Sequence, residues 1–387
     1  MKALIEVAGK KVTLFSPLSG HVFNPLTFEM GRTGGSARNL ARYHDDLNQV
    51  LTRSSGDSGE KFWKVYEAET LEAAFELVYG VLGEDATYAT VHDVIMGIPL
   101  DVEHGKSAAF GETVCGKLLN TAMTRGMDVR SIADLFLKKI PSVGEKARGA
   151  IVAQAAASVA PFTHGPIVNA VNGRTTLSPE QMLSGHTVLD FDTLTYGVPG
   201  LAFQLIVSWF LQGATLRRTG DFPYFCLYRD EYHEFSHARD IQAQSLGRSQ
   251  RYIGISMFQT FPVLKAAFGG GVEAETQAQA VYGLHVNKVM VNNNCRETNE
   301  LNAEILGRHK DMFFSGGGRV HQEQGAWYDV LGVGNAPTVN FSQQWHYLFP
   351  PTDFQRLRTG GPRNHFLVDA VVTRGDDNFF LHTFSQR

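Results

Sequence analysis

Cysteine is scarce in this sequence, with only Cys115, Cys226 and Cys295 among 387 residues, each far from the others. Such spacing forms neither a disulfide framework nor a C-x-x-C metal knuckle, and it fits a reducing compartment. Long apolar runs are also lacking. The most apolar stretch, Leu201–Ala214, is shorter than the roughly 20 residues of a membrane helix, and the first 15 residues contain no signal-peptide core. We therefore expect a cytoplasmic protein.

No charge of one sign dominates either. The 35 Lys and Arg residues and 39 Asp and Glu residues leave a formal net charge of -4. This balance argues against a protein coated all over in nucleic acid, although it is compatible with a local basic groove. The 43% of apolar and 19% of charged residues are typical of a soluble globular protein with a substantial core. The length allows two or three domains.

The sequence changes character near Ser178-Pro179. Residues 37–160 have apolar side chains three and four positions apart and few prolines, which predicts a series of helices. Beyond this point, short β-rich runs alternate with helical stretches, which predicts a parallel sheet with helices packed on it. An early strand, Lys11–Phe15, is expected to join the same sheet, so the helical block is inserted into an α/β domain.

The expected division is residues 1–36 as the first part of the α/β domain, 37–178 as an inserted all-α domain, and 179–387 as the remainder. The expected strands after the insertion are His186–Phe191, Tyr224–Tyr228, Tyr252–Met257, Lys288–Asn292, Phe366–Val372 and Phe379–Phe384. The expected helices are Leu201–Arg218, Ala238–Leu246, Glu273–Leu284 and Thr298–Leu306.

Residues 222–237, FPYFCLYRDEYHEFSH, match two different active-site patterns. The first is H-E-x-x-H, in which His233 and His237 on one helix face bind zinc and Glu234 acts as general base. A third ligand is needed, and the only candidates lie on the later helix that includes Glu300 and Glu304. The extended H-E-x-x-H-x-x-G-x-x-H form is absent. The alternative for the two histidines is a surface position just past a strand.

The second pattern is a buried strand that ends in Asp230-Glu231, the acidic pair of nucleotide hydrolases. The first acid reaches Mg²⁺ and the second orients the attacking water. A parallel sheet places both at the carboxyl ends of its strands, where ligands bind in such folds. Gln259, at the end of the next strand, is placed to sense a γ-phosphate. Arg248 is a candidate for charge stabilisation, and a solvated helix end is the alternative for it.

Several further segments, in chain order, accompany the acidic pair. They are Phe23-Asn24-Pro25-Leu26, Phe62-Trp63, Ser178-Pro179-Glu180 with Val188-Leu189-Asp190, Tyr196-Gly197 through Arg218, Asp240, Arg248-Ser249, Gln259, Arg296-Glu297-Thr298 through Gly307, and Phe354 with Leu357-Arg358-Thr359-Gly360-Gly361. This ordered set resembles the coupling-protein ATPases of conjugation and type IV secretion, the TraG/TraD family, which are related to the FtsK/HerA DNA pumps. The resemblance extends over nearly the whole chain.

The resemblance implies a RecA-like, mostly parallel sheet with helices on both faces and an inserted all-α domain. It implies ATP and Mg²⁺ as cofactors, with Asp230 reaching the metal through water and Asp230, Glu231, Gln259 and Arg248 as catalytic residues. The implied partners are single-stranded DNA, relaxosome proteins and a type IV secretion channel, and the implied assembly is a homo-hexamer at the cytoplasmic face of the inner membrane. Arg356, Arg358 and Arg363 are candidate phosphate contacts, and a solvated turn is the alternative.

Two departures from the family pattern limit what the resemblance implies. Arg229 stands before the acidic pair, where the family usually has a small or apolar residue. No G-x-x-x-x-G-K-[ST] motif occurs: Gly105-Lys106-Ser107 has Leu100 at the position of the first glycine, and GRTGGS at residues 31–36 has no lysine. Without P-loop amides and lysine, the phosphates have no cradle.

We therefore expect the C-terminal portion of a coupling ATPase that does not hydrolyse ATP by itself, with the P-loop and the membrane segment missing from this chain. Two alternatives stay open. One is a non-catalytic paralogue that binds DNA or a partner protein, and the other is a zinc metallopeptidase that uses His233, Glu234 and His237.

Overall fold

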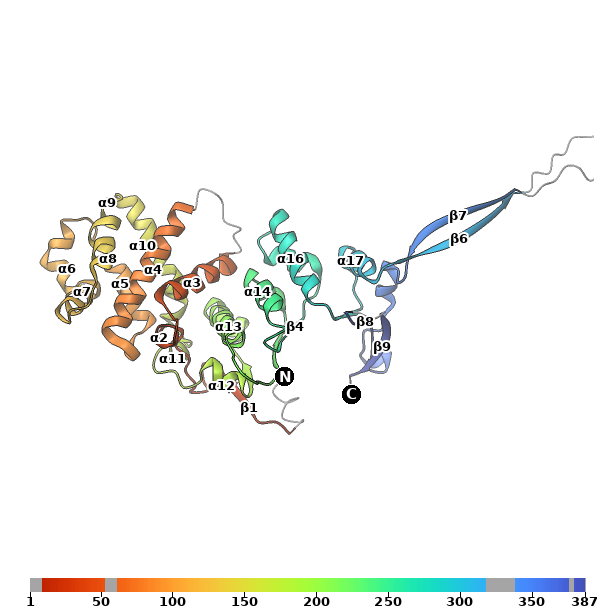
Figure 1. The fold of residues 1–387 in the computed structure, drawn as a ribbon, viewed down its shortest axis with the longest axis horizontal. Coiled ribbons are helices and arrows are strands. Elements are labelled where there is room, and N and C mark those ends of the chain that lie inside the picture. The colour runs from red at the N-terminus through yellow and green to blue at the C-terminus, as the bar shows by residue number, and fades with distance from the viewer. Residues whose placement is uncertain (1–8, 53–60, 318–337, 376–378, 387) are drawn as a thin grey trace, which may run out of the picture. The chain divides into compact units, whose positions relative to one another are not determined.

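The computed structural model describes residues 9–52, 61–317, 338–375 and 379–386 (Figure 1). Contacts divide the chain into two units. The first comprises Met1–Gln259 and Val263–Leu284, and the second Thr260–Pro262 and His285–Arg387. This division does not follow the boundaries expected at residues 36 and 178, and the three-part division stays a prediction.

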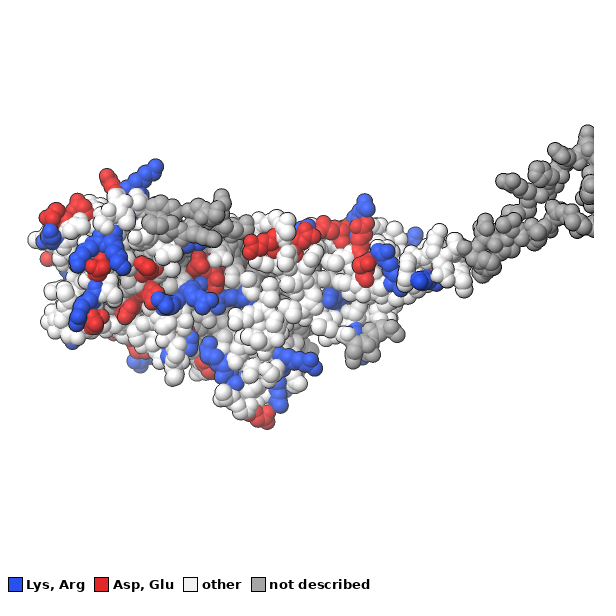
Figure 2. Space-filling model, turned by 45° about the horizontal axis from the view of Figure 1, so that its top comes forward, with Lys and Arg blue, Asp and Glu red and all other residues white. Residues whose placement is uncertain are grey.

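The described part of residues 37–178 is helical, as expected. Its helices are α3 (Ala37–Thr52), α4 (Lys61–Leu82), α5 (Tyr88–Met96), α6 (Ala108–Glu112), α7 (Val114–Thr124), α8 (Arg130–Asp134), α9 (Ile140–Ser142), α10 (Glu145–Val159) and α11 (Val168–Val171). In Figure 1, α3, α4, α5 and α10 run beside one another. Figure 2 shows basic and acidic side chains interspersed over this helical block, as the balanced composition suggests.

The remaining elements of the first unit include the long helix α13 (Thr193–Leu216), which contacts α3 of the helical block. The others are β1 (Val12–Phe15), α2 (Pro25–Gly31), α12 (Pro179–Leu183), β2 (His186–Leu189), β3 (Phe225–Arg229), α14 (Ala238–Leu246), β4 (Tyr252–Ser256) and α16 (Gly271–Leu284). Helix α15 (Phe261–Ala267) contributes the residues from Val263 onward. One hydrophobic core runs through this unit, from Phe15 on β1 to Tyr252 on β4.

The range of α13 begins at Thr193, but two helices meet in it across a kink at Gly197, whose backbone is not helical (φ 58°, ψ -145°). Pro199 follows the kink, and both residue types usually interrupt a helix. The longer helix after the kink begins close to the expected Leu201. Of the described residues, only α13 forms a helix that is long and apolar enough to cross a membrane, and 56% of its most apolar 18-residue window is buried inside the protein. Its apolar composition is explained by packing, since Phe203 and Phe210 belong to the core.

The second unit contains a three-stranded antiparallel sheet in the order β5 (Lys288–Val291), β8 (Leu367–Thr373), β9 (Phe380–Ser385), with α17 (Arg296–Leu306). Its core includes Met290, Leu306 and Phe354. A hairpin of ten-residue strands, β6 (Arg308–Gly317) and β7 (Thr338–Tyr347), was not expected from the sequence. It is the blue two-stranded ribbon in Figure 1.

The described strands form four small sheets, and the expected single RecA-like sheet is not among them. Strands β1 and β2 pair in parallel, as do β3 and β4, whereas β5–β8–β9 and β6–β7 are antiparallel. The fold class is therefore mixed α/β with mostly helical content. Alternating β and α segments predict that neighbouring strands run parallel. Such a local pattern does not predict whether strands from distant parts of the chain pair into one continuous sheet.

Candidate functional site

The two acids predicted for nucleotide chemistry lie directly after β3. Strand β4 runs parallel to β3, and the pairing continues past the strand ends because the Met257 N–H donates to the Arg229 carbonyl at 3.0 Å. The carboxyl ends of parallel strands meet at one edge of a sheet. Asp230, Glu231 and Gln259 accordingly lie at the same edge of the β3–β4 pair.

The structure brings the side chains of Glu231 and Gln259 together. The Gln259 amide donates to the two carboxylate oxygens of Glu231 at 3.2 Å and 3.4 Å, and His233 Nδ1 lies 3.4 Å from Glu231 Oε2. Glu231 adopts left-handed backbone angles (φ 47°, ψ 48°), which cost of order 1–3 kcal/mol for a residue with a side chain. Strained residues of this kind cluster at functional sites.

Asp230 completes a pair of exposed carboxylates at this edge. Its carboxylate accepts a hydrogen bond from the Glu231 N–H at 3.0 Å. Carboxylate oxygens are hard donors of the kind that Mg²⁺ takes, usually one or two from the protein together with water and phosphate oxygens. The donor set therefore suits Mg²⁺ and a water molecule, whereas the sequence has no P-loop for the phosphates.

Arg229 does not perturb the acids, because its side chain points into the core. It is 6% exposed, and its guanidinium donates to the carboxylate of fully buried Asp240 at 2.5 Å. Burial by itself lowers the pKa of Arg229, but the adjacent Asp240 carboxylate outweighs burial and holds the pKa above its usual value. Arg229 therefore remains a buried cation paired with a buried anion.

Asp240 also fixes the loop that carries the acids. Its carboxylate accepts hydrogen bonds from the Tyr232 hydroxyl at 2.9 Å, the Gln212 amide at 2.7 Å and the His237 N–H at 3.2 Å. Tyr232 follows Glu231 immediately, and His237 ends the loop. This role is not apparent from the sequence, because the partners of a buried acid come from several elements of the fold.

The zinc interpretation is wrong in its central requirement, a single helix that carries both histidines. His233 lies in a one-turn 3-10 helix, Tyr232–Glu234. His237 is the N-cap of α14, where its Nδ1 accepts a hydrogen bond from the Arg239 N–H at 3.2 Å. The described residues include no group of three His, Cys, Asp or Glu side chains that could hold a metal ion. Directly after β3, where a zinc helix would begin, the chain forms only this single turn.

Arg248 lies at the opposite end of β4 from Gln259. It follows α14 and precedes the first residue of β4, Tyr252. Five residues of strand span about 16 Å, so the exposed Arg248 side chain is remote from Asp230 and Glu231 of the same chain. Its predicted charge-stabilising role stays a prediction and requires a second subunit.

The three arginines proposed as phosphate contacts lie in the second unit and differ in their surroundings. Arg358 forms a bidentate pair with Asp369, with both N···O distances 2.7 Å. The Arg358 guanidinium holds the pKa of the Asp369 carboxyl well below its usual range. Arg356 lies 3.2 Å from Asp353, and Arg363 is exposed. Arg358 thus has a structural partner, and phosphate binding stays a prediction for all three.

A pair of substitutions separates these roles. We expect Arg358→Gln to lower the thermal unfolding midpoint at pH 7, because Asp369 loses its guanidinium partner. Arg363→Gln should leave the midpoint unchanged. If Arg363 contacts phosphate, its substitution should reduce the salt dependence of single-stranded DNA binding by about one unit of slope. An unchanged midpoint for Arg358→Gln would contradict its structural role.

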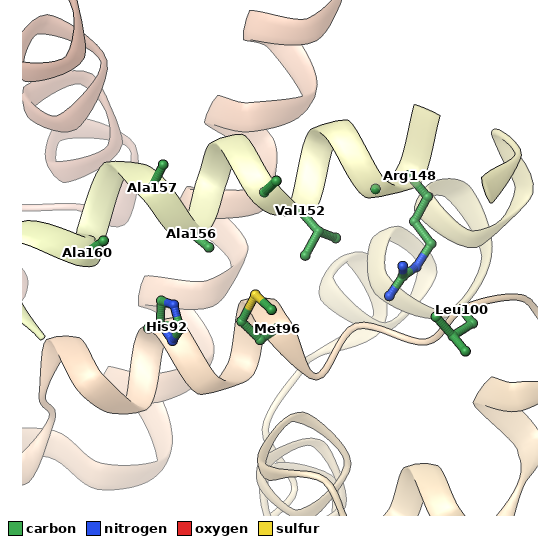
Figure 3. Close-up of a pocket in the computed structure, with 10 residues that line it drawn as sticks. His92, Met96, Leu100, Arg148, Val152, Ala156, Ala157 and Ala160 are labelled. Atoms are coloured by element: carbon green, nitrogen blue, oxygen red, sulfur yellow. The ribbon is translucent and has the colours of Figure 1, made fainter. Parts of the chain in front are cut away.

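A separate cavity of about 540 Å³ lies between α5 and α10 (Figure 3). His92 and Met96 line it from α5, and Val152 and several alanines line it from α10. The Arg148 guanidinium donates to the Pro99 carbonyl at one end. The lining is mostly apolar, with His92 and Arg148 as its polar side chains.

No protein-family model matches this sequence, and no curated protein matches it significantly. Solved structures do match. An unbound monoclinic form of the bacterial conjugative coupling protein TrwB is 13% identical with a TM-score of 0.58, covering 97% of this chain and 74% of that chain. The plasmid coupling protein TrwB in complex with ADP and Mg²⁺ is 12% identical with a TM-score of 0.58, covering 96% and 72%.

A third match is TrwB in complex with the non-hydrolysable ATP analogue ADPNP, at 11% identity and a TM-score of 0.58, covering 100% of this chain and 82% of that chain. The chain therefore has a fold similar to that of TrwB over almost its entire length. This similarity agrees with the resemblance inferred from the sequence motifs, and at such low identity it concerns the fold.

Proposed function

We propose that this chain, with its TrwB-like fold, is the part of a conjugative coupling ATPase that supplies the acids for Mg²⁺ and water. One observation carries the proposal: the Gln259 amide holds the carboxylate of Glu231, beside Asp230, at the carboxyl edge of a parallel strand pair. TrwB structures with the same fold have been solved with ADP and Mg²⁺ and with an ATP analogue. These ligands support the assignment of the edge to a nucleotide.

Each residue would have a defined task at this edge. Asp230 would hold Mg²⁺ through water, Glu231 would take a proton from the attacking water, and Gln259 would orient the Glu231 carboxylate. ATP with Mg²⁺ supplies the phosphoryl group that is hydrolysed. Arg248 would act on the site of the next subunit in a hexameric ring, since it lies at the other end of its own β4.

The cellular role that we propose is transfer of single-stranded DNA with relaxosome proteins to a type IV secretion channel, at the cytoplasmic face of the membrane. The RecA-like organisation of the strands and the inserted position of residues 37–178 belong to this proposal. The sequence contains no G-x-x-x-x-G-K-[ST] motif, so this polypeptide alone is proposed not to hydrolyse ATP.

The test is reconstitution of hydrolysis. The purified chain should show no Mg²⁺-dependent ATP hydrolysis, and addition of a polypeptide with the strand, P-loop and helix of a TraG/TraD-family ATPase should produce it. Glu231→Gln should then lower the rate at least about hundredfold, a typical effect of removing a group that assists proton transfer. Glu180→Gln, which removes an exposed acid on α12, is the matched control and should have no effect.

Two results would reject the proposal. Hydrolysis by the chain alone that survives Glu231→Gln would show that the acids are not the catalytic groups. Binding of single-stranded DNA with no hydrolysis under any of these conditions would favour the non-catalytic DNA-binding alternative, which the missing phosphate cradle already supports.

A further inference from the structure

The cavity between α5 and α10 has a volume of about 540 Å³ and mostly apolar walls. On the α10 side its lining residues have short side chains, and they share one helix face because they recur three and four positions apart. They are Gly149, Val152, Ala153, Ala156, Ala157 and Ala160. Such short side chains leave space between α10 and α5 that bulkier residues would fill. We call this space the α5–α10 cavity.

The apolar surface continues at the rim of the α5–α10 cavity. Met96, the last residue of α5, and Leu100, shortly after it, line the cavity and are 54% and 60% exposed. In Figure 3 the Met96 side chain extends toward α10. The lining from Gly149 to Ala160 spans about 16 Å of helix. An apolar group of similar length therefore finds walls on two helices.

A single cation lies at one end of the lining. The Arg148 side chain extends from α10 toward the segment after α5 (Figure 3), where its guanidinium donates to the backbone carbonyls of Ile98 and Pro99. A guanidinium has five N–H donors, so three remain. Within the part of the chain that the structure describes, none of these three has an acceptor, and no carboxylate forms an ion pair with Arg148.

The charges around the lining favour an anion at this end of the cavity. Burial lowers the pKa of Arg148, and Glu145, an exposed residue at the start of α10, opposes this effect only in part. The cation therefore has too little negative charge beside it. His92, toward the other end of the cavity in Figure 3, lies 3.6 Å from the carboxylate of Asp93. That end already has an acid, so an anionic group is better placed at Arg148.

We propose that the α5–α10 cavity binds an amphipathic carboxylate of the fatty-acid class. Its carboxylate would accept from the remaining N–H groups of Arg148, because a guanidinium presents a planar fork that matches a carboxylate. Its alkyl chain would lie between Met96 and the short side chains of α10. Small-molecule sites are typically apolar cavities of this size with few polar groups. The proposal is independent of the proposed function, because no lining residue belongs to the nucleotide edge.

The head group is tested by titration calorimetry of the full chain with dodecanoate and with dodecanol, both below the concentrations at which they aggregate. We expect dodecanoate to bind at least about tenfold more tightly, because only the carboxylate pairs with the guanidinium. Arg148→Gln should remove this preference and leave dodecanol binding unchanged. Lys146→Gln is the matched control, since it removes an exposed cation of α10 that does not line the cavity, and it should have no effect.

The position of the alkyl chain is tested by a change on the α5 side. Met96→Glu places a charge in the apolar wall and should weaken binding of both dodecanoate and dodecanol at least about tenfold. Met123→Glu is the matched control, because Met123 on α7 is 55% exposed and lies outside the lining. Circular dichroism confirms that each variant is folded. Since Arg148→Gln also removes the contacts with two carbonyls, Met96→Glu keeps the proposal testable if that variant unfolds.

Four outcomes would overturn the proposal. Equal affinity for dodecanoate and dodecanol would show that Arg148 does not select the head group, and full binding by Met96→Glu would place the chain elsewhere. Binding to phosphatidylglycerol vesicles without binding to monomeric dodecanoate would identify a membrane surface as the source of the anion. Self-association of the chain that Met96→Glu abolishes, without dodecanoate binding, would identify a second copy as the occupant.

Discussion

Replacing Asp240 with asparagine is expected to lower the free energy of unfolding by about 3–5 kcal/mol, because it leaves a buried guanidinium without its anion. Arg229 and Asp240 are 6% and 0% exposed, and they are 2.5 Å apart. Asparagine keeps the shape of the side chain but not its charge. Arg229 Nε has no hydrogen-bond partner, and the remaining contacts of the guanidinium, with the Ser256 hydroxyl at 3.4 Å and the Tyr232 ring at 4.4 Å, carry no negative charge.

The change should show as a lower midpoint of denaturant unfolding at pH 7. Asp134→Asn is the matched control. It removes an acid from the exposed pair that Asp134, the last residue of α8, forms with Lys138, and we expect a change within about 0.5 kcal/mol. A double variant, Arg229→Met with Asp240→Asn, should recover most of the lost stability because no charge remains buried.

The same substitution bears on the candidate site. Asp240 accepts hydrogen bonds from Tyr232 and from the His237 backbone, and these residues enclose the loop that begins with Glu231. We therefore expect Asp240→Asn to lower reconstituted ATP hydrolysis even under conditions where the chain stays folded. A loss of stability below about 1 kcal/mol would mean that Arg229 finds other partners and that the pair does not secure the loop.

The second large effect is a loss of stability at acidic pH caused by His44. This histidine is fully buried among Phe75, Tyr88 and Phe162. Burial lowers its pKa from 6.5 to about 4, only partly opposed by the hydrogen bond to the Ser158 carbonyl. The carbonyl can only accept, so Nδ1 carries the hydrogen at 3.0 Å and Nε2 accepts from the Tyr88 hydroxyl at 3.3 Å. The geometry thus selects the neutral ring.

The direction of the pH effect follows from the two pKa values. Between pH 6.5 and about 4, the unfolded chain binds a proton at His44 that the folded chain does not. Stability therefore falls as the pH is lowered through this window, by about 3 kcal/mol in total, and the full contribution is present above pH 6.5. Below about pH 4 both states are protonated and the effect no longer grows.

A His44→Gln variant isolates this contribution. Its free energy of unfolding should decrease less between pH 7 and pH 4 than that of the unchanged chain. When both free energies are plotted against pH, the difference between the two curves gives the contribution of His44. His237, whose pKa burial also lowers, and Glu67, whose pKa burial raises, titrate in both proteins. His186→Gln, at an exposed histidine, should leave the curve unchanged. Parallel curves for His44→Gln and the unchanged chain would contradict the prediction.

Much of the local structure could be predicted because it depends on local patterns. Helix α14 has the expected bounds, Ala238–Leu246, and β4 begins at the expected Tyr252. The range of α13 is interrupted by the non-helical Gly197, so the longer helix after this kink starts close to the expected Leu201. The β6–β7 hairpin was missed because its two strands are far apart in sequence and their pairing, from Arg308 with Tyr347 to Gly317 with Thr338, is not a local property.

The candidate site also has features that could be predicted from the sequence and features that could not. The meeting of Glu231 with Gln259 could be expected, since both follow neighbouring parallel strands. The position of Arg229 could not, because its direction depends on buried Asp240, eleven residues later. The H-E-x-x-H pattern was misleading because it specifies residue types at set spacings and says nothing about whether the intervening backbone is helical. In this chain a turn separates His233 from His237.

The sequence by itself determined the order of the elements, the all-helical character of the first part and the place of the acidic pair, because each depends on residues close along the chain. Only the tertiary structure decided that the described strands form separate small sheets and that Arg229 turns inward to Asp240. The physical reason is that burial, charge pairing and strand pairing are properties of segments brought together from distant positions. A pattern within a short stretch records which side chains need a partner but not which partner the folded chain supplies.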